Sequence, residues 1–438
     1  MIGLSRAAPP PDGLAIDIAY PLMDMDAWND IVAEFSVDGD VRKGAGSAGT
    51  VFPELTMLNL QADEARVLGM RMDHAVLRLL RDPEAGQWSM NVRSDQTTGT
   101  LKWRQTEGKV VGRVSGRFAR LGLGDDPADG PSLLPENGTG EISFDDELDM
   151  PAITLEADEL RIYGHSAGAL SLEGVKDVAA GNWRLESLFL GNGHAKVRGT
   201  GSRRLRGRQR GLSLKANAEV ADLGAWLDGA GFADVMEGGQ SVLKGGFEWR
   251  DFPWTHRKDR LGGSLDVQLD KGRFSKLGSR SAKLLELLSL QSVARLSSLD
   301  KGLTGLTQEG FPFDQLRGSV ELSKGVAHAR DYKVIRPVGT ILLEGNSNII
   351  DESLDMQAVI VPNLDVSGAT IAAGIAINPV IGVGAFLSQW LFKNPLARAM
   401  TVRYRVTGTW DDPVVTEIKS EEAAVASGTK GAGPPAGH

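Results

Sequence analysis

The segment Leu60-Gln-Ala-Asp-Glu-Ala-Arg-Val-Leu-Gly69 is echoed later in the chain by Leu155-Glu-Ala-Asp-Glu-Leu-Arg-Ile-Tyr-Gly164. A second pair, Gly86-Gln-Trp88 and Gly181-Asn-Trp183, keeps the same register relative to the first. Two segments that share one register indicate a duplicated structural unit. Each copy has short runs of alternating apolar and polar residues separated by glycine turns, which is typical of strands. The sequence therefore predicts a mainly β protein, built from repeated β units that bury their open faces against one another.

The repeats also divide the chain into regions. Residues 123–144, between the two copies, are rich in Gly, Pro, Asp and Asn, which predicts a long exposed loop. After residue 420, Ala, Gly and Pro dominate, as in disordered tails. We predict a disordered N-terminus at 1–13, a duplicated β-repeat region at 14–202 with units at about 54–120 and 150–202, a C-terminal β module at 203–418 and a disordered tail at 419–438.

Composition excludes several classes of protein. With 438 residues the chain can bury a large core. The formal net charge of -9 argues against a nucleic-acid-binding protein. The absence of cysteine excludes disulfides, thiolate metal sites and cysteine nucleophiles, and fits any compartment. Residues 1–13 contain no apolar run of the kind found in signal peptides, so export would depend on a segment that this sequence does not contain.

One motif resembles a catalytic element. Gly164-His-Ser-Ala-Gly168 matches the G-x-S-x-G elbow of α/β-hydrolases, which requires a helix after the serine. Here residues 169–173 continue as a strand pattern, and the repeat partner Gly69 is followed by Met-Arg-Met without a serine. The six histidines have no metal-binding spacing. We therefore expect no enzymatic activity, no catalytic residue, no metal and no cofactor.

Two segments in the second half of the chain have helical patterns. Residues 282–296 carry leucines, among them Leu284 and Leu288, on more than one face. This breadth predicts a helix buried on several sides, at the wall or mouth of an apolar trough, although ordinary core packing accounts for it nearly as well.

The other segment, residues 366–392, has no charged residue and is interrupted by Asn378-Pro379. Proline breaks a straight helix, so the pattern predicts a hairpin of two short apolar helices. Each half is too short to cross a bilayer core of about 30 Å. The hairpin either dips into a membrane or plugs an apolar channel, or else it is buried in the core of a soluble domain. On the first interpretation the contacting residues are Ile371, Ile375, Val380, Ile381, Phe386 and Trp390.

Several motifs resemble the C-terminal part of the YhdP family of AsmA-like proteins. They are Leu284-Leu-Glu-Leu-Leu-Ser-Leu-Gln291, Gly310-Phe-Pro-Phe-Asp-Gln-Leu-Arg-Gly318, Val361-Pro-Asn-Leu364 and Tyr404-Arg-Val-Thr-Gly-Thr-Trp-Asp-Asp-Pro413. The upstream repeats and Asp24-Met-Asp-Ala-Trp28 are similar to the region that precedes them in the family. The resemblance covers residues 14–418.

The resemblance implies a fold and a function. It implies an elongated, twisted and open β-groove with an apolar interior, in a periplasmic or envelope protein that conducts phospholipid between the inner and outer membranes and supports outer-membrane lipid homeostasis. In full-length relatives an N-terminal helix anchors the protein in the inner membrane, and we expect this chain to correspond to a C-terminal portion. The implied partners are phospholipid and a membrane, the outer membrane through the hairpin at 366–392, together with possible envelope proteins and no nucleic acid.

Alternation identifies the residues that would line the groove. We expect acyl chains to contact Leu214, Val267, Leu269, Phe274, Leu284 and Leu288. A non-conducting scaffold or outer-membrane assembly factor remains the alternative, because repeated β units with charged exteriors suit that role too. The inner face discriminates between the two functions: a conduit needs an unbroken apolar trough, whereas a scaffold fills it with side chains.

Overall fold

The protein is mainly β, as the sequence predicts. The computed structural model describes residues 13–26, 55–82, 84–104, 112–125, 150–177, 182–204, 211–249, 258–274, 311–336, 339–362, 401–410 and 412–418. These residues contain twenty strands, and they form two compact units. Unit 1 comprises residues 1–217 and 247–257, and unit 2 comprises residues 218–246 and 258–438.

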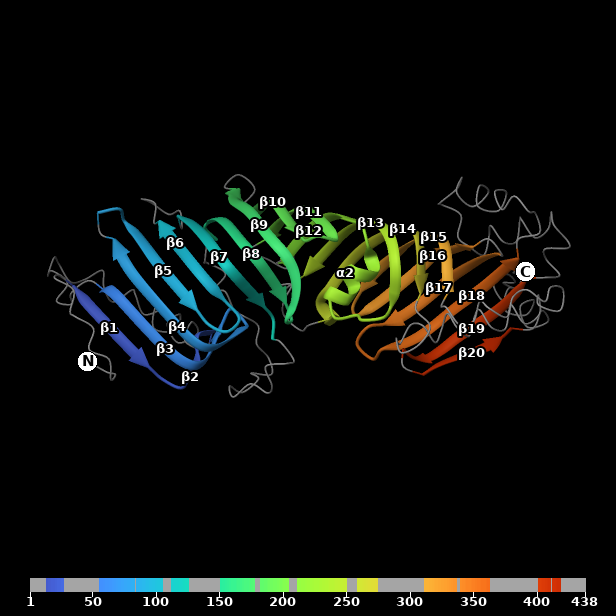
Figure 1. Ribbon diagram of the computed structural model, residues 1–438, viewed down its shortest axis with the longest axis horizontal. Coiled ribbons are helices and arrows are strands. Elements are labelled where there is room, and N and C mark those ends of the chain that lie inside the picture. The colour runs from blue at the N-terminus through green and yellow to red at the C-terminus, as the bar shows by residue number, and fades with distance from the viewer. Residues whose placement is uncertain are drawn as a thin grey trace, which may run out of the picture. The chain divides into compact units, whose positions relative to one another are not determined.

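Unit 1 is a sheet in which strands follow one another in sequence order (Figure 1). Its strands are β1 (Leu14–Ala19), β2 (Leu22–Asp24), β3 (Leu55–Val67), β4 (Met70–Asp82), β5 (Gln87–Arg93), β6 (Thr98–Arg104), β7 (Arg113–Leu123), β8 (Ala152–Ile162), β9 (His165–Asp177), β10 (Asn182–Gly191), β11 (Ala195–Arg204) and most of β12 (Gly211–Val220).

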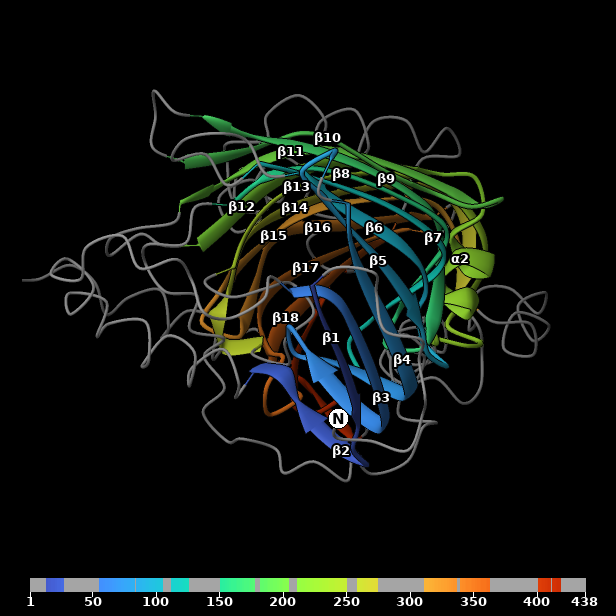
Figure 2. The same cartoon turned by 90° about the vertical axis from the view of Figure 1, so that its left-hand side faces the viewer.

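Most neighbours in unit 1 pair antiparallel, and three pairs are parallel. Strands β3 to β7 form one antiparallel series, and β8 to β11 form another. β7 and β8 pair in parallel and join the two series, while β1 and β2 pair in parallel with β3. The sheet curls in the view of Figure 2, from β3 and β4 through β7 to β10 and β11. No pairing among the described strands closes it, so it stays open.

The two segments that the sequence repeats both lie in a hairpin with the same turn. β3 and β4 are joined by Leu68 and Gly69, with φ of 53° and 72°, and β8 and β9 by Tyr163 and Gly164, with φ of 49° and 79°. Two successive positive φ angles define the tight hairpin turn that matches the right-handed twist of strands. The glycine at the second position has no Cβ to oppose this conformation.

Unit 2 is a second antiparallel series. Its elements are α2 (Leu223–Gly229), most of β13 (Met236–Trp249), the 3-10 helix η3 (Lys258–Arg260), β14 (Leu261–Phe274), β15 (Phe311–Ser323), β16 (Val326–Arg336), β17 (Gly339–Asn348), β18 (Ser353–Pro362), β19 (Val402–Thr409) and β20 (Pro413–Glu417). Each strand from β14 to β20 pairs with the next. α2 begins where the Asp222 carboxylate accepts a hydrogen bond from the Ala225 amide, a common helix cap.

Several predicted features lie outside the described residues. They are the helix at 282–296, the apolar hairpin at 366–392, the termini at 1–12 and 419–438, and all but the first few residues of the loop at 123–144. Among the described residues, no helix has the length and apolar composition needed to cross a membrane.

Candidate functional site

One side of the sheet in unit 1 is apolar. In β4, Ala75 and Leu77 are buried, whereas Val76 and Arg78 between them are exposed. β7 shows the same alternation, with Phe118 buried and its neighbour Arg117 exposed. Side chains alternate between the two faces of a sheet, so each strand directs its apolar residues to one side.

The register aligns these residues into continuous rows across the strands. The first row is Leu60, Leu77, Val92, Gly99, Phe118, Ala157, Leu170, Leu190 and Val197. The second row is Leu58, Leu79, Met90, Leu101, Gly116, Leu155, Leu172, Leu188 and Gly199. No charged residue interrupts either row. Most of the first row is buried and most of the second is partly exposed.

Unit 2 has the same arrangement. One row is Leu269, Leu316, Val334, Ile341, Ile360 and Val402. The other is Leu265, Val320, Ala329, Gly345, Met356, Val406 and Val415. We call the side of each sheet that carries these rows the apolar face of that unit.

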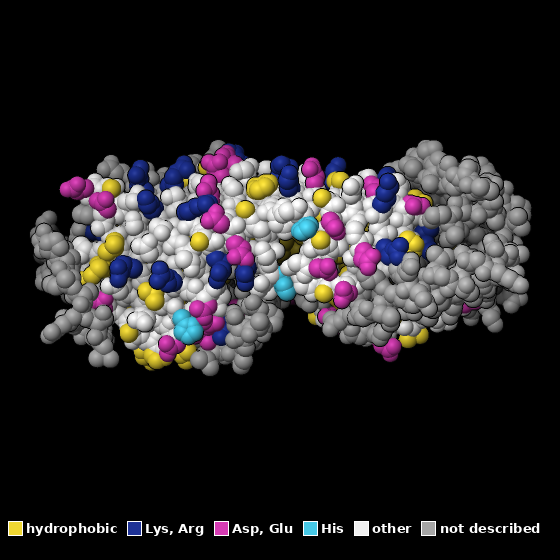
Figure 3. Space-filling view, in the orientation of Figure 1, with side chains coloured by type: hydrophobic (Ala, Val, Ile, Leu, Met, Phe, Trp, Pro, Cys, Tyr) yellow, Lys and Arg dark blue, Asp and Glu magenta, His cyan; other side chains and the backbone are white. Residues whose placement is uncertain are grey.

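The opposite side of each sheet carries charged residues, although in unit 2 Leu342, Val359 and Val361 on that side are buried. Figure 3 shows Lys, Arg, Asp and Glu side chains scattered over the visible surface, with small apolar patches between them. Arg117 contacts Glu156 at 3.3 Å and Asp158 at 2.5 Å, and in unit 2 Arg330 contacts Glu321 at 2.7 Å. Exposed pairs of this kind contribute about 0–1 kcal/mol each, so they keep the face hydrated more than they stabilise the fold.

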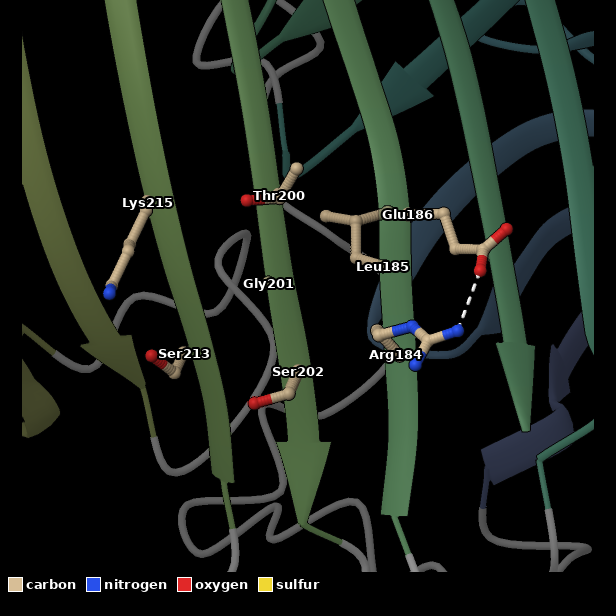
Figure 4. Close-up of a pocket in the computed structure, with 8 residues that line it drawn as sticks. All are labelled: Arg184, Leu185, Glu186, Thr200, Gly201, Ser202, Ser213 and Lys215. Carbon is tan, nitrogen blue, oxygen red and sulfur yellow. Dashed lines mark hydrogen bonds and ion pairs between the residues drawn. The ribbon is translucent and has the colours of Figure 1, made fainter. Parts of the chain in front are cut away.

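A hollow of about 420 Å³ lies among polar side chains of β10, β11 and β12. Arg184, Thr200, Ser202, Ser213 and Lys215 line much of it (Figure 4). The Arg184 guanidinium donates to Glu186 at 2.8 Å. These side chains alternate with those of the apolar rows, so the hollow belongs to the charged side of the sheet.

Burial changes two ionisation equilibria in unit 2. Tyr332 pairs with Leu343, and burial, with a smaller contribution from the charge of Asp331, raises the pKa of its phenol to about 12. Burial also lowers the pKa of the Arg336 guanidinium to about 10, against the opposing effect of Asp314. The Arg336 Nε donates to the Pro312 carbonyl oxygen at 3.1 Å. Both shifts reflect a sheet that water reaches poorly at this point.

Four of the residues predicted to contact acyl chains lie in described strands. Leu269 is 2% exposed and pairs with Leu316, and Val267 is half-buried on the same side of β14. The Phe274 ring packs against Phe313, with ring centroids 4.9 Å apart. Leu214 is half-buried and lies beside Gly199. Leu284, Leu288 and the six residues of the apolar hairpin are outside the described residues.

Apart from Leu214, sequence reasoning identified no residue of the apolar face of unit 1. Each strand there contributes one residue to each row, and the continuity of the rows depends on the register between strands. The alternation in β4, from Ala75 to Leu79, was the available signal.

The catalytic motif has no elbow geometry. Ser166 is exposed at the start of β9, which continues as a strand to Asp177 with no helix after the serine. Within the described residues, no group of three or more His, Cys, Asp or Glu side chains is placed to hold a metal ion.

Comparison with known proteins agrees with the motifs. The family model described as YhdP protein matches residues 1–415. The chain is 30% identical over 171 residues to the Intermembrane phospholipid transporter YhdP of Escherichia coli strain K12. That alignment covers 39% of this chain and 13% of the relative, so the chain spans a small part of that protein. No solved structure matches the chain. The family match covers nearly the whole sequence, and the chain belongs to the YhdP family.

Proposed function

We propose that this chain conducts phospholipid along its apolar face. The observation that carries the proposal is the pair of continuous apolar rows in each unit, opposite a charged side. Acyl chains lie against the rows, while head groups stay in water beside the sheet. The relative from Escherichia coli is named as an intermembrane phospholipid transporter, which supports the same substrate class for this chain.

The energetics need no chemical step. Each methylene that leaves water gains about 0.8 kcal/mol, so an acyl chain is held by the extent of the apolar surface. The rows repeat at every strand, so a lipid moves between similar environments and meets no deep trap. No bond is made or broken, and the function therefore requires no acid, base or metal.

The proposal places the chain in the cell envelope, on the path between the inner and outer membranes. The apolar hairpin at residues 366–392 would contact a membrane at one end of this path. In this role it delivers lipid to the outer membrane or receives lipid from it.

Photo-crosslinking tests the proposal. A photo-reactive residue at Leu77, Val267 or Leu269 should capture phospholipid in cells, because these side chains belong to the apolar face. The matched controls are Arg78 and Gln268, which are the next residues along β4 and β14 and point to the other side. Capture only at the two controls would rule out conduction along this face.

A non-conducting scaffold is the competing function, and one observation favours it. Leu60, Leu77 and Phe118 are only 4%, 7% and 4% exposed, as in a sheet whose face is already filled. Native mass spectrometry of the purified chain separates the two functions. Co-purified phospholipid supports conduction, and its reproducible absence supports the scaffold.

A further inference from the structure

Four aromatic rings on the apolar faces lie over glycines of the preceding strand. Phe118 of β7 covers Gly99 of β6, and Trp183 of β10 covers Gly174 of β9. In unit 2, Phe313 of β15 covers Gly272 of β14, and Tyr332 of β16 covers Gly318 of β15.

The contacts leave no room for a side chain beneath the rings. A Cβ on Gly272 would lie 2.6 Å from Phe313 Cζ, and one on Gly318 would lie 2.5 Å from Tyr332 Cδ2. A Cβ on Gly99 or Gly174 would overlap the ring above it. Each ring therefore rests directly on the backbone of its neighbour.

The rings are also fixed in place. The Trp183 indole Nε1 donates to the Pro151 carbonyl oxygen at 3.0 Å, and the ring is 4% exposed. Phe313 packs against Phe274 and is 3% exposed. A substitution beneath such a ring has to displace the ring itself, because the ring is rigid and its neighbours are packed.

Side chains in a sheet normally stand roughly perpendicular to it. An upright aromatic ring would rise above the aliphatic side chains beside it and interrupt the row. Gly99 and Phe118 are consecutive members of the first row of unit 1, so a raised Phe118 ring would stand across that row. A ring that lies on a glycine fills the space beside the aliphatic side chains without adding height.

We propose that the four ring-over-glycine pairs keep the apolar faces flush, and thereby determine which acyl chains can lie along them. This inference rests on the proposed function and specifies it: the pairs select the acyl moiety of a phospholipid by its thickness. Rings packed on glycines also strengthen strand pairing. The test must therefore distinguish an effect on how acyl chains lie along the face from an effect on the stability of the sheet.

The experiment uses the purified full chain and vesicles of phosphatidylethanolamine and phosphatidylglycerol that carry a trace of diazirine-acyl phosphatidylethanolamine. The readout is the yield of phospholipid crosslinked to the protein, measured by mass spectrometry. Gly272→Ala should lower the yield about tenfold, the size of effect expected from overpacking an apolar site. The atoms nearest its added Cβ all belong to the side chains of Phe313 and Met236. A second probe, whose acyl chain carries a bulky pyrene group in addition to the diazirine, should show a larger fall in crosslinking yield than the slim diazirine probe.

Removing the ring should restore passage. In the double variant Gly272→Ala with Phe313→Leu, the new methyl has no ring to raise, and most of the yield should return. Gly246→Ala is the matched control, because Gly246 lies on the charged side of β13 with nothing within 4 Å of its added Cβ. It should leave the yield unchanged.

Each outcome decides the inference. An unchanged yield in folded Gly272→Ala overturns it, and so does an equal loss in the single and double variants. If Gly272→Ala unfolds, Gly174→Ala with and without Trp183→Leu provides the same comparison in unit 1, because the atoms nearest its added Cβ all belong to the Trp183 ring. If the wild-type chain takes up no lipid, the proposed function fails and this inference fails with it. If the wild-type chain takes up lipid and the glycine variants give the same yield as the wild type, only the inference is refuted.

Discussion

Tyr332 is the residue that best reports the dryness of the apolar face. Its ring covers Gly318. Burial of the side chain raises the pKa of the Tyr332 phenol to about 12, and the charge of Asp331 adds to this shift. An unfolded tyrosine ionises near pH 10. The folded protein therefore keeps the phenol proton over a range in which the unfolded chain loses it.

This difference predicts a loss of stability at high pH. The contribution of Tyr332 is fully present below about pH 10 and is lost as the pH rises towards 12, by about 2–3 kcal/mol at most. The measurement is denaturant unfolding of the wild type and of Tyr332→Phe across this range. Subtracting the two curves removes the effects of all other groups, including Arg336, and the wild type should lose stability relative to the variant. Tyr20→Phe, at a ring that is 63% exposed, controls for the loss of one hydroxyl. A constant difference between wild type and Tyr332→Phe would contradict the prediction.

At the level of single elements, the sequence predicts strands well and their partners poorly. The alternation of β12 and β14 and the short helix α2 can be located from residue patterns, because those patterns are local. The parallel pairing of β7 with β8 cannot, since the segment between them is long and leaves either direction open. The positive φ of Lys271, within β14, is equally hidden, because lysine has no preference for that conformation.

A contact made just after β2 cannot be predicted from the sequence either, because its partners lie more than forty residues away. Asp26, just after β2, accepts hydrogen bonds from the amides of Leu68 and Gly69 at 2.6 and 2.7 Å. Its carboxylate therefore ties the first strands of unit 1 to the turn between β3 and β4. Hydrogen bonds to a charged acceptor are stronger than neutral ones.

Asp26→Ala should destabilise unit 1 by about 1–3 kcal/mol, because two amides of a tight turn lose a charged partner. Hydrogen exchange at Leu68 and Gly69 provides a direct readout, and both amides should exchange faster in the variant. Asp82→Ala is the comparison, since Asp82 accepts from Glu84 and Ala85 in an exposed turn and should matter less. Equal effects of the two substitutions, or unchanged exchange at Leu68, would show that Asp26 does not hold the turn.

At the level of the whole molecule, the motifs predicted the family, and alternation predicted part of the apolar face. The sequence places Val267 and Leu269 on one face of a strand, because apolar and polar residues alternate without interruption in this part of β14. The rows of unit 1 could not be identified in this way, because their continuity depends on strand register, which no single strand specifies. The packing of Phe118 and Trp183 on glycines could not be predicted either, since a glycine in a strand can mark a bulge, a bend or the close approach of another group.

The membrane-contact interpretation of residues 366–392 remains a prediction at this scale. Replacing both Ile375 and Val380 by Asp should abolish binding of the chain to liposomes, because charged side chains resist transfer into the bilayer. The circular dichroism of the β-sheets should not change. A double variant that instead unfolds would show that the hairpin belongs to a protein core.

Sequential pairing has a consequence for how such a protein folds and evolves. From β3 to β11 and from β14 to β20, nearly every strand pairs with its neighbour in the chain. Contacts between sequence neighbours close small loops, so each hairpin can form early and independently, and fraying at one edge need not spread. Removing a hairpin such as β5 and β6 would bring β4 beside β7 in the same antiparallel sense. A gene can thus lengthen or shorten this architecture in steps of about 10 Å, two strand spacings at a time, while every remaining strand keeps its kind of neighbour.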